Sequence, residues 1–316
     1  MLTTAQTKFF DDQGYLVVEN VLDQKTVLDP VRAEYASLLD RLYADWFAKG
    51  RVPNPTGMSY YDKLLASYRA KCDWFQPFDI SLPANEVQPD TPFHFGPAVF
   101  NMLTNPRLLD MVEDLIGGEI TSNPIQHIRI KPPATDLAVD EKRAHITATD
   151  WHQDQGVTHD SADDTKLITV WIAVSDATRE NGCLQVQPAR HKDELLPHCE
   201  KVQVGIPDEF IGGHRSIPVP VKSGGVVIFH PKAPHASLIN KTDGFRWSFD
   251  VRYNVTGQPT GRDHFPSFVA RSRAKPDTEL HDPKKWLNMW KDARTHLADA
   301  QHISLYRWDN TAPYCA

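Results

Sequence analysis

Asp150-Trp151-His152-Gln153-Asp154-Gln155-Gly156 places a histidine and an aspartate two residues apart. Residues at this spacing in an extended strand project to the same face, so His152 and Asp154 can reach one metal ion together. A second histidine would complete the two-histidine, one-carboxylate set of non-heme Fe(II) oxygenases, which leaves metal positions open for a co-substrate and O₂. In a chain with 14 histidines the triplet is weak evidence by itself, and its alternative interpretation is a solvent-facing strand edge.

The sequence after this stretch is a succession of short apolar runs separated by Gly, Pro and Asn. Residues 167–174 alternate around Trp171, and Ser223-Gly224-Gly225 turns the chain into a further run. Short strands at this spacing predict an antiparallel sandwich or barrel. The expected fold class is mainly β with flanking helices, as a double-stranded β-helix, or cupin-like jelly roll. The other predicted strands are 183–187, 226–229, 236–239 and 245–253.

The missing metal ligand is expected from one of two histidines in this run of strands. His235 stands at the start of a strand, and His230 stands at the end of the preceding one. Arg246 follows on the next strand and offers a planar fork of donors suited to a carboxylate. Arg252 shares the face of Arg246 and is a rival anchor, but six residues along a strand separate the two by roughly 20 Å. Only one of them can bind a given carboxylate.

Residues 125–131 form an alternating strand ahead of the metal motif. His127, Arg129 and Lys131 share one face of it. That face is either solvated or turned into a ligand cavity, as happens in barrel-like folds. The loop that follows has mixed charge, and we expect its His145 to be exposed.

Helical patterns dominate the first part of the chain. Apolar residues at three- and four-residue spacing over 26–46 predict a long amphipathic helix. A second helix is predicted to begin at Asn105-Pro106 and to end at Gly117-Gly118. The aromatic-rich residues 50–100 are either packed core or a lid over a substrate pocket.

Nothing in the sequence reads as a linker between two cores, so one domain over residues 1–316 is expected. We divide it into helical or lid elements at about 1–120, a metal-binding jelly-roll core at about 120–255 and a C-terminal helical extension at about 256–316. The apolar stripe that includes Trp286 and Trp290 in this extension indicates packing or a subunit contact.

Composition points to a small molecule as the partner. A net charge of −7 argues against nucleic acid and anionic membranes, and a homo-oligomer is compatible with the sequence. Four cysteines without a C-x-x-C pair predict neither a disulfide framework nor a zinc knuckle, which fits a reducing compartment. The N-terminus does not resemble a signal peptide, and no apolar run has transmembrane length, so we expect a cytoplasmic protein.

The ordered combination of motifs resembles the phytanoyl-CoA dioxygenase family of Fe(II)/2-oxoglutarate oxygenases, from about residue 9 to 254. The resemblance implies that His152, Asp154 and His235 bind Fe(II), with 2-oxoglutarate and O₂ as co-substrates. It rests on Phe9-Phe10-Asp-Asp-Gln-Gly14-Tyr15, His152-x-Asp154, Thr169-Val-Trp171-Ile-Ala-Val174, Glu180-Asn-Gly-Cys-Leu184 and His235-Ala-Ser237-Leu-Ile-Asn-Lys-Thr-Asp-Gly-Phe-Arg246.

The same resemblance assigns the co-substrate pocket. It implies that Arg246, with Ser237, holds the distal carboxylate of 2-oxoglutarate, and that Trp171, His127 and Lys131 line the pocket. The chain departs from the family pattern at Pro188-Ala189-Arg190-His191, where Pro-Gly-Ser-His is usual. This departure leaves the metal ligands in place but puts the local turn in question.

The expected reaction is oxidation, most often hydroxylation, of a C–H bond of a small organic metabolite in specialised-metabolite biosynthesis, with release of succinate and CO₂. An acyl-CoA hydroxylase of the same mechanism is the alternative. A chloride-transferring halogenase would need the position of Asp154 vacated for halide. A non-redox metal-dependent cupin enzyme has no use for Arg246 as a 2-oxoglutarate anchor. A catalytically silent binding module would need neither the three metal ligands together nor the arginine.

Overall fold

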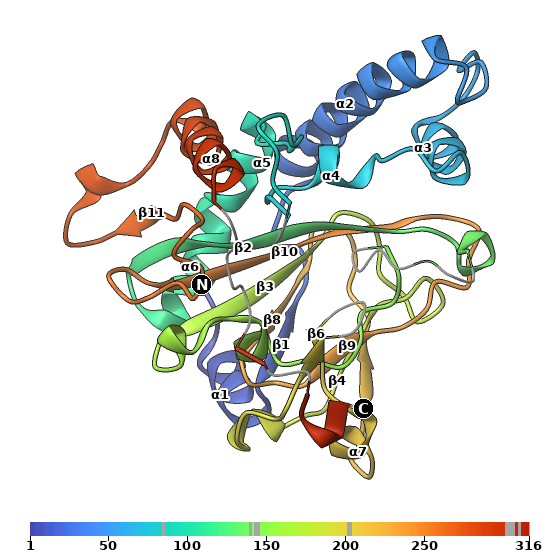
Figure 1. The fold of residues 1–316 in the computed structure, drawn as a ribbon. Coiled ribbons are helices and arrows are strands. Elements are labelled where there is room, and N and C mark those ends of the chain that lie inside the picture. The colour runs from blue at the N-terminus through green and yellow to red at the C-terminus, as the bar shows by residue number, and fades with distance from the viewer. Residues whose placement is uncertain are drawn as a thin grey trace.

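The computed structural model describes residues 1–83, 86–138, 141, 146–200, 204–300, 307–308 and 311–315. His145, which we expected to be exposed, lies outside this set. Figure 1 shows a layer of helices over one face of a broad sheet, with the smaller strands below it. The helices in the described part of the chain are α1 (Thr4–Gln13), α2 (Asp29–Ala48), α3 (Tyr60–Arg69), α4 (Phe75–Phe78), α5 (Pro97–Leu103), α6 (Pro106–Ile116), α7 (Asp208–Ile211) and α8 (Pro283–Ala298).

The strands form one large sheet and two small ones. The large sheet has the order β1 (Tyr15–Val18), β8 (Val226–Phe229), β3 (Leu167–Ala173), β10 (Arg246–Val255), β2 (Glu119–Lys131) and β11 (Phe268–Ser272). The second sheet has the order β7 (Ile217–Val219), β4 (Leu184–Val186) and β9 (His235–Ser237), and β5 (Cys199–Glu200) pairs with β6 (Val204–Gly205). All the pairings are antiparallel.

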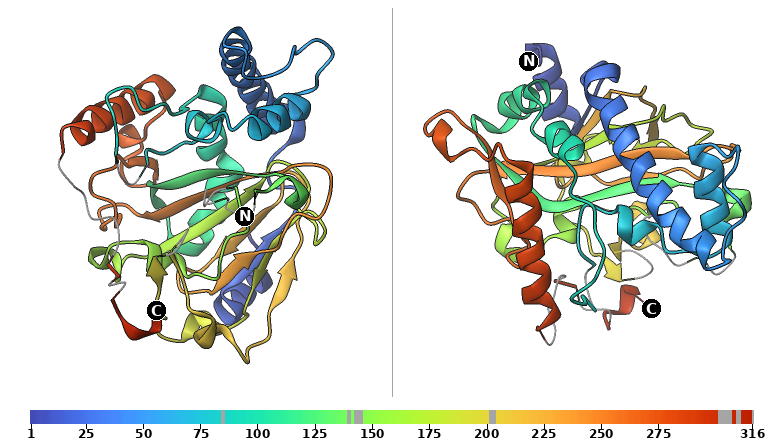
Figure 2. Two further views of the ribbon diagram at one scale, coloured as in Figure 1. Left: turned by 45° about the vertical axis from the view of Figure 1, so that its right-hand side comes forward. Right: turned by 90° about the horizontal axis from the view of Figure 1, so that it is seen from above.

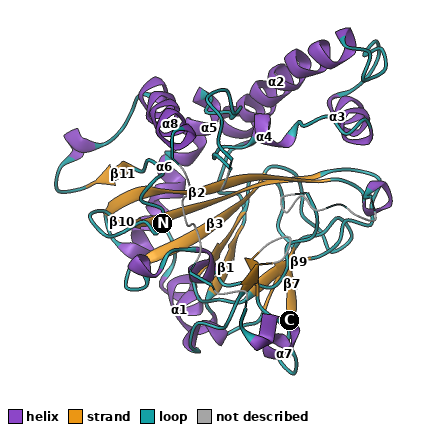
Figure 3. Cartoon of the chain, viewed as in Figure 1, coloured by secondary structure: helices purple, strands orange, loops and turns teal. Residues whose placement is uncertain are grey.

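The chain crosses repeatedly between the large sheet and the second one. It runs from β3 to β4 and β7, returns to β8, passes to β9 and returns to β10. Figure 3 shows these strands as two groups joined by loops, with the long helices on the outer side of the large sheet. The space between the two groups is where side chains from both sheets meet.

Strand β10 separates the two sides of the large sheet by its period of two. Trp247 and Phe249 are buried in the main hydrophobic core, together with Tyr35 from α2. Arg246 and Arg252 instead line a cavity on the other side. One face of β10 therefore joins the main hydrophobic core, and the other face carries polar groups.

The predicted long helix begins later than expected. A π-helical turn covers Gln24–Leu28, and the regular helix α2 then extends to Ala48. Val31, Tyr35 and Leu39 form its buried stripe, and each fully buried side chain of this kind contributes about 1.5–3 kcal/mol. The predicted start of the second helix is confirmed, because the Asn105 side chain accepts the N–H of Arg107.

Most aromatic residues of the 50–100 region are packed core, whereas Tyr61 is exposed. Trp74 and Phe78 are fully buried, and the ring of Phe78 meets that of Tyr35 edge to face at 5.3 Å. The C-terminal helix α8 joins the same core, where Trp290 stacks on Phe95 at a centroid distance of 4.7 Å. The view from above in Figure 2 shows α2 and α8 lying across the strands of the large sheet.

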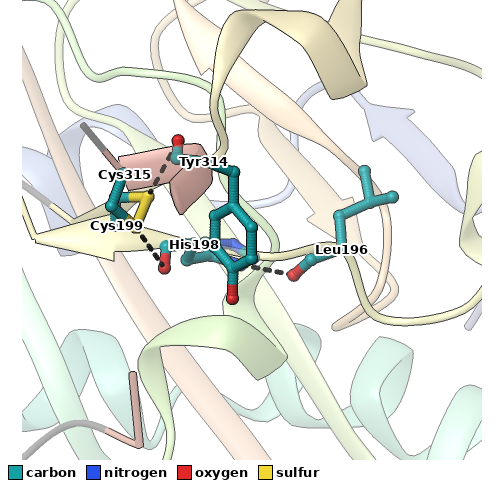
Figure 4. The surroundings of a disulfide bond; sticks show 5 residues. All are labelled: Leu196, His198, Cys199, Tyr314 and Cys315. Atoms are coloured by element: carbon teal, nitrogen blue, oxygen red, sulfur yellow. Dashed lines mark hydrogen bonds between the residues drawn. A yellow bond between two sulfur atoms is a disulfide. The ribbon is translucent and has the colours of Figure 1, made fainter. Parts of the chain in front are cut away.

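A disulfide joins Cys199 on β5 to Cys315, with Cα atoms 5.4 Å apart (Figure 4). The prediction of no disulfide is therefore wrong for this pair. The expectation of a reducing compartment rests on the absence of disulfides, so the cysteines no longer support it. The two cysteines are 116 residues apart, so no local spacing could reveal them. Cys72 and Cys183 are buried and free.

Among the residues that the structure describes, no helix combines the length and the apolar character needed to cross a membrane.

Candidate metal centre

Strand β9 and the segment that leads into the 3₁₀ turn Asp154–Val157 bring the predicted ligands together. His152 and His235 exchange backbone hydrogen bonds, with N···O distances of 3.0 Å in both directions. Gln153 has an extended backbone, so His152 and Asp154 project to the same side although Asp154 already begins a 3₁₀ turn. The predicted strand across residues 152–154 therefore ends at Gln153. The two side chains nevertheless lie on the same side, as predicted.

The three side chains form one buried cluster. Ligand atoms of His152, Asp154 and His235 all lie within 4.8 Å of one another. The Nε2 of His152 is 3.9 Å from Oδ1 of Asp154, and the Nε2 of His235 is 3.8 Å from Oδ2. The alternative histidine, His230, packs against His191 instead.

Both histidines are held in the tautomer that a metal requires. The Nδ1 of His152 donates to the carbonyl of Asp150 at 2.8 Å, and that of His235 donates to the carbonyl of Ala233 at 3.0 Å. Because a carbonyl can only accept, each Nε2 carries a lone pair toward the cluster. Burial, followed by the nearby His235, lowers the pKa of His152 to about 3, so this ring is neutral at physiological pH.

Asp154 has one oxygen engaged and one free. Arg252 donates to Oδ1, whereas Oδ2 is buried and has no hydrogen-bond partner among the residues that the structure describes. Burial by itself raises the pKa of Asp154, but Arg252 and the two histidines lower it more, so the net shift is downward. An ionised carboxylate with an unpartnered oxygen beside two imidazole lone pairs fits a divalent cation.

Arg246 is a buried cation beside this cluster. Its Nη1 donates to the hydroxyl of Ser248 at 2.8 Å, its guanidinium lies 5.0 Å from the ring centroid of Trp171, and its Nε has no partner. Among the described residues no carboxylate lies within ion-pair distance of it. Burial, and then the charge of Arg129, lower the pKa of Arg246 to about 9. A buried cation in this state is stabilised by an incoming carboxylate.

Lys131 and Ser237 complete the polar wall next to Arg246. The Nζ of Lys131 donates to the Ser237 hydroxyl at 2.7 Å and to the carbonyl of Leu238. Burial, and then Arg246 and Arg129, hold the pKa of Lys131 well below its ordinary value. His127 is directed elsewhere, because its Nδ1 lies 2.8 Å from a carboxylate oxygen of Asp79.

Comparison with known proteins identifies the chain. A family model described as phytanoyl-CoA dioxygenase (PhyH) matches residues 10–248. The chain belongs to this family. A probable phytanoyl-CoA dioxygenase of Caenorhabditis elegans is 28% identical over 265 residues, which cover 80% of this chain and 75% of the relative. The peroxisomal phytanoyl-CoA dioxygenase of Homo sapiens is 26% identical, over 80% of this chain and 68% of the relative.

Solved structures show the same fold. The non-heme monooxygenase ThoJ has a TM-score of 0.56 at 18% identity, covering 93% of this chain and 97% of its own. The predicted double-stranded β-helix is confirmed. This member of the phytanoyl-CoA dioxygenase family is an Fe(II)/2-oxoglutarate-dependent oxygenase, with 2-oxoglutarate and O₂ as its co-substrates.

A large cavity adjoins the cluster of His152, Asp154 and His235 in this dioxygenase. Its volume is about 790 Å³, within the range of small-molecule sites. Thr149 lines both this cavity and the smaller one around the metal ligands. The described residues that line the two cavities all lie beyond residue 128. The described residues of the aromatic segment 50–100 line neither cavity.

Sequence reasoning missed several residues of the smaller cavity, which surrounds the predicted metal ligands. Arg129 donates to Asp250 at 2.9 Å, and both residues line the cavity together with Thr169. Strand alternation predicted that Arg129 and Asp250 lie on the polar faces of β2 and β10. No local pattern indicated that the two side chains pair. The pairing of Arg252 with Asp154 spans 98 residues and had no sequence signal at all.

Proposed function

We propose that this dioxygenase hydroxylates a C–H bond of a small organic metabolite, with release of succinate and CO₂, and that residues 1–316 act as one catalytic domain. His152, Asp154 and His235 would hold the iron. Iron bound there supplies the redox chemistry that couples O₂ and 2-oxoglutarate to C–H oxidation. The observation that carries the proposal is Arg246, a buried cation that has no carboxylate partner among the described residues and lies next to the cluster of His152, Asp154 and His235.

The chain's own residues bind and orient the co-substrate. Arg246, together with the hydroxyl of Ser237, would hold the distal carboxylate of 2-oxoglutarate, since a planar guanidinium matches a carboxylate. Lys131 donates a hydrogen bond to the Ser237 hydroxyl, and the ring of Trp171 forms the wall under the guanidinium. His127 belongs to the proposed pocket only at its edge, because its ring is bound to Asp79.

We place the substrate in the 790 Å³ cavity. Its exposed rim includes Arg179, Glu180 and Lys241, and its inner wall includes Ala236 and Ile206. Such a mixture suits a metabolite with polar substituents on an apolar frame. The solved epimerase SnoN, at 18% identity and a TM-score of 0.50 over 81% of this chain and 86% of its own, is a complex with Fe³⁺, alpha-ketoglutarate and nogalamycin RO. This likeness supports a role in specialised-metabolite biosynthesis, and an acyl-CoA is the alternative that the relatives' names suggest.

The proposed setting is the cytoplasm, with small molecules as partners and self-association into a homo-oligomer. Disulfides are rare in that compartment, so the Cys199–Cys315 bond makes the proposal testable. Alkylation of free thiols in intact cells, followed by mass spectrometry, should find this pair reduced in a cytoplasmic protein. A fully oxidised pair would place the enzyme in an oxidising compartment, and light scattering of the purified protein would determine its oligomeric state.

The function is tested by anaerobic titration of Fe(II)-loaded protein with 2-oxoglutarate. Wild type should develop a weak visible metal-to-ligand charge-transfer band, and Arg246→Ala should require a much higher 2-oxoglutarate concentration for the same band. Arg271→Ala is the matched control, since Arg271 is a buried arginine bound to Asp110 and Glu113 outside the cavity. Iron binding without any band in wild type would favour the non-redox cupin alternative.

A further inference from the structure

Arg252 is the second buried arginine on β10, and its partners differ from those of Arg246. Its Nη2 donates to Oδ1 of Asp154, and its Nη1 donates to the carbonyl of Ile125 at 3.1 Å. The side chain is 3% exposed. The guanidinium is therefore anchored at two points, one on the backbone and one on the predicted metal ligand.

This arrangement leaves Arg252 unable to serve as the co-substrate anchor without abandoning Asp154. The register of β10 against β2 also shifts between Asp250, which pairs with His127, and Arg252, which pairs with Asn123. The extra residues lie on β2, and β10 keeps a regular register with β3. The two arginines thus have separate tasks, although they lie on the same face of one strand.

The contact engages one of the two oxygens of Asp154. Oδ1 accepts from Arg252 and lies 3.9 Å from Nε2 of His152. Oδ2 lies 3.8 Å from Nε2 of His235 and has no hydrogen-bond partner in the described part of the chain. A carboxylate that is free to turn can bind a metal through both oxygens, which occupies a position that a chelating co-substrate needs. A carboxylate with one oxygen held offers only the other.

We propose that Arg252 is a positioning residue that holds Asp154 so that Oδ2 alone ligates the iron, keeping the remaining positions open for 2-oxoglutarate and O₂. The inference rests on the proposed role of His152, Asp154 and His235 as metal ligands. Arg252 itself touches neither metal nor co-substrate. The guanidinium suits this task because its donors form a rigid planar fork, with one arm on the backbone of Ile125.

Arg252→Met and Arg246→Met make a matched pair for the test, since each removes a buried arginine from the same face of β10. Dissociation constants for Mn(II), and for 2-oxoglutarate in the Mn(II)-loaded protein, are measured on folded samples. Arg252→Met should weaken Mn(II) binding by about tenfold or more, the effect usual for the loss of a group that orients a metal ligand. Arg246→Met should leave Mn(II) binding within about threefold of wild type and weaken 2-oxoglutarate binding instead.

The energy of the Fe(II)–2-oxoglutarate charge-transfer band provides a readout that general loosening of the fold would not move. We expect a shifted band in Arg252→Met and a weaker band at unchanged energy in Arg246→Met. Wild-type Mn(II) affinity together with an unshifted band in Arg252→Met overturns the inference. If that variant does not fold, Arg252→Lys keeps the charge without the fork, and wild-type values in it are equally decisive. A wild-type protein that binds neither Mn(II) nor Fe(II) would instead refute the proposed function.

Discussion

Asp154 and His152 are both predicted metal ligands, yet their removal should affect the fold differently. Asp154→Ala leaves the guanidinium of Arg252 buried without its carboxylate, which costs about 3–5 kcal/mol. His152→Ala removes a ring that is neutral at physiological pH. Both variants should lose Fe(II) binding, but urea unfolding of the metal-free proteins should show strong destabilisation only in Asp154→Ala. Equal unfolding midpoints would contradict the charge pairing described for Arg252.

The charge of Arg246 should make 2-oxoglutarate binding insensitive to pH in the alkaline range. Burial and the charge of Arg129 lower the pKa of Arg246, but a guanidinium keeps its proton in folded proteins, so the partner of the carboxylate stays charged. The dissociation constant for 2-oxoglutarate should therefore stay within about threefold from pH 7.5 to about 9. Calorimetry on Mn(II)-loaded protein measures this profile. A steep rise within this range would assign the anchor to another group, such as Lys131, whose pKa is held well below its ordinary value.

At the scale of elements, the 3₁₀ turn Asp154–Val157 depends on what packs behind it. The backbone N–H of Gln153 donates to Nε2 of His198 at 2.9 Å, and the ring of Trp308 stacks on that of His198. A Cβ on Gly156 would lie 2.3 Å from the His198 ring. The predicted metal-ligand segment is therefore supported by His198, the residue before β5, and by Trp308.

Gly156→Ala tests the support that His198 gives to the turn without altering any predicted metal ligand. The added methyl group must displace the His198 ring, and overpacking of this kind costs about 1–3 kcal/mol. The variant should therefore bind Fe(II) more weakly and unfold at a lower urea concentration. Gly244→Ala is the matched control, because a Cβ there has no atom within 4 Å. If both variants behave as wild type, His198 does not support the turn.

At the scale of the whole molecule, the features predicted correctly are those with a local pattern. Alternation and turn residues predicted the strands of the jelly roll, and the motif with the later His235 predicted the ligand cluster. The Cys199–Cys315 bond and the Arg252–Asp154 pair depend on chain segments about 100 residues apart, so no window of sequence contains them. The sequence does not show which surface the aromatic segment 50–100 packs against. Its assignment to the core depends on the helical layer on the outer face of the large sheet, where Phe78 packs on Tyr35.

The central claim is that one side of this sheet holds iron and 2-oxoglutarate together. The most direct test is anomalous diffraction at the iron edge from crystals grown anaerobically with Fe(II) and 2-oxoglutarate. The account predicts one strong peak bounded by the Nε2 atoms of His152 and His235 and by Oδ2 of Asp154, with the distal carboxylate of 2-oxoglutarate on Arg246. A peak elsewhere, or a co-substrate carboxylate bound to Arg252, would contradict it.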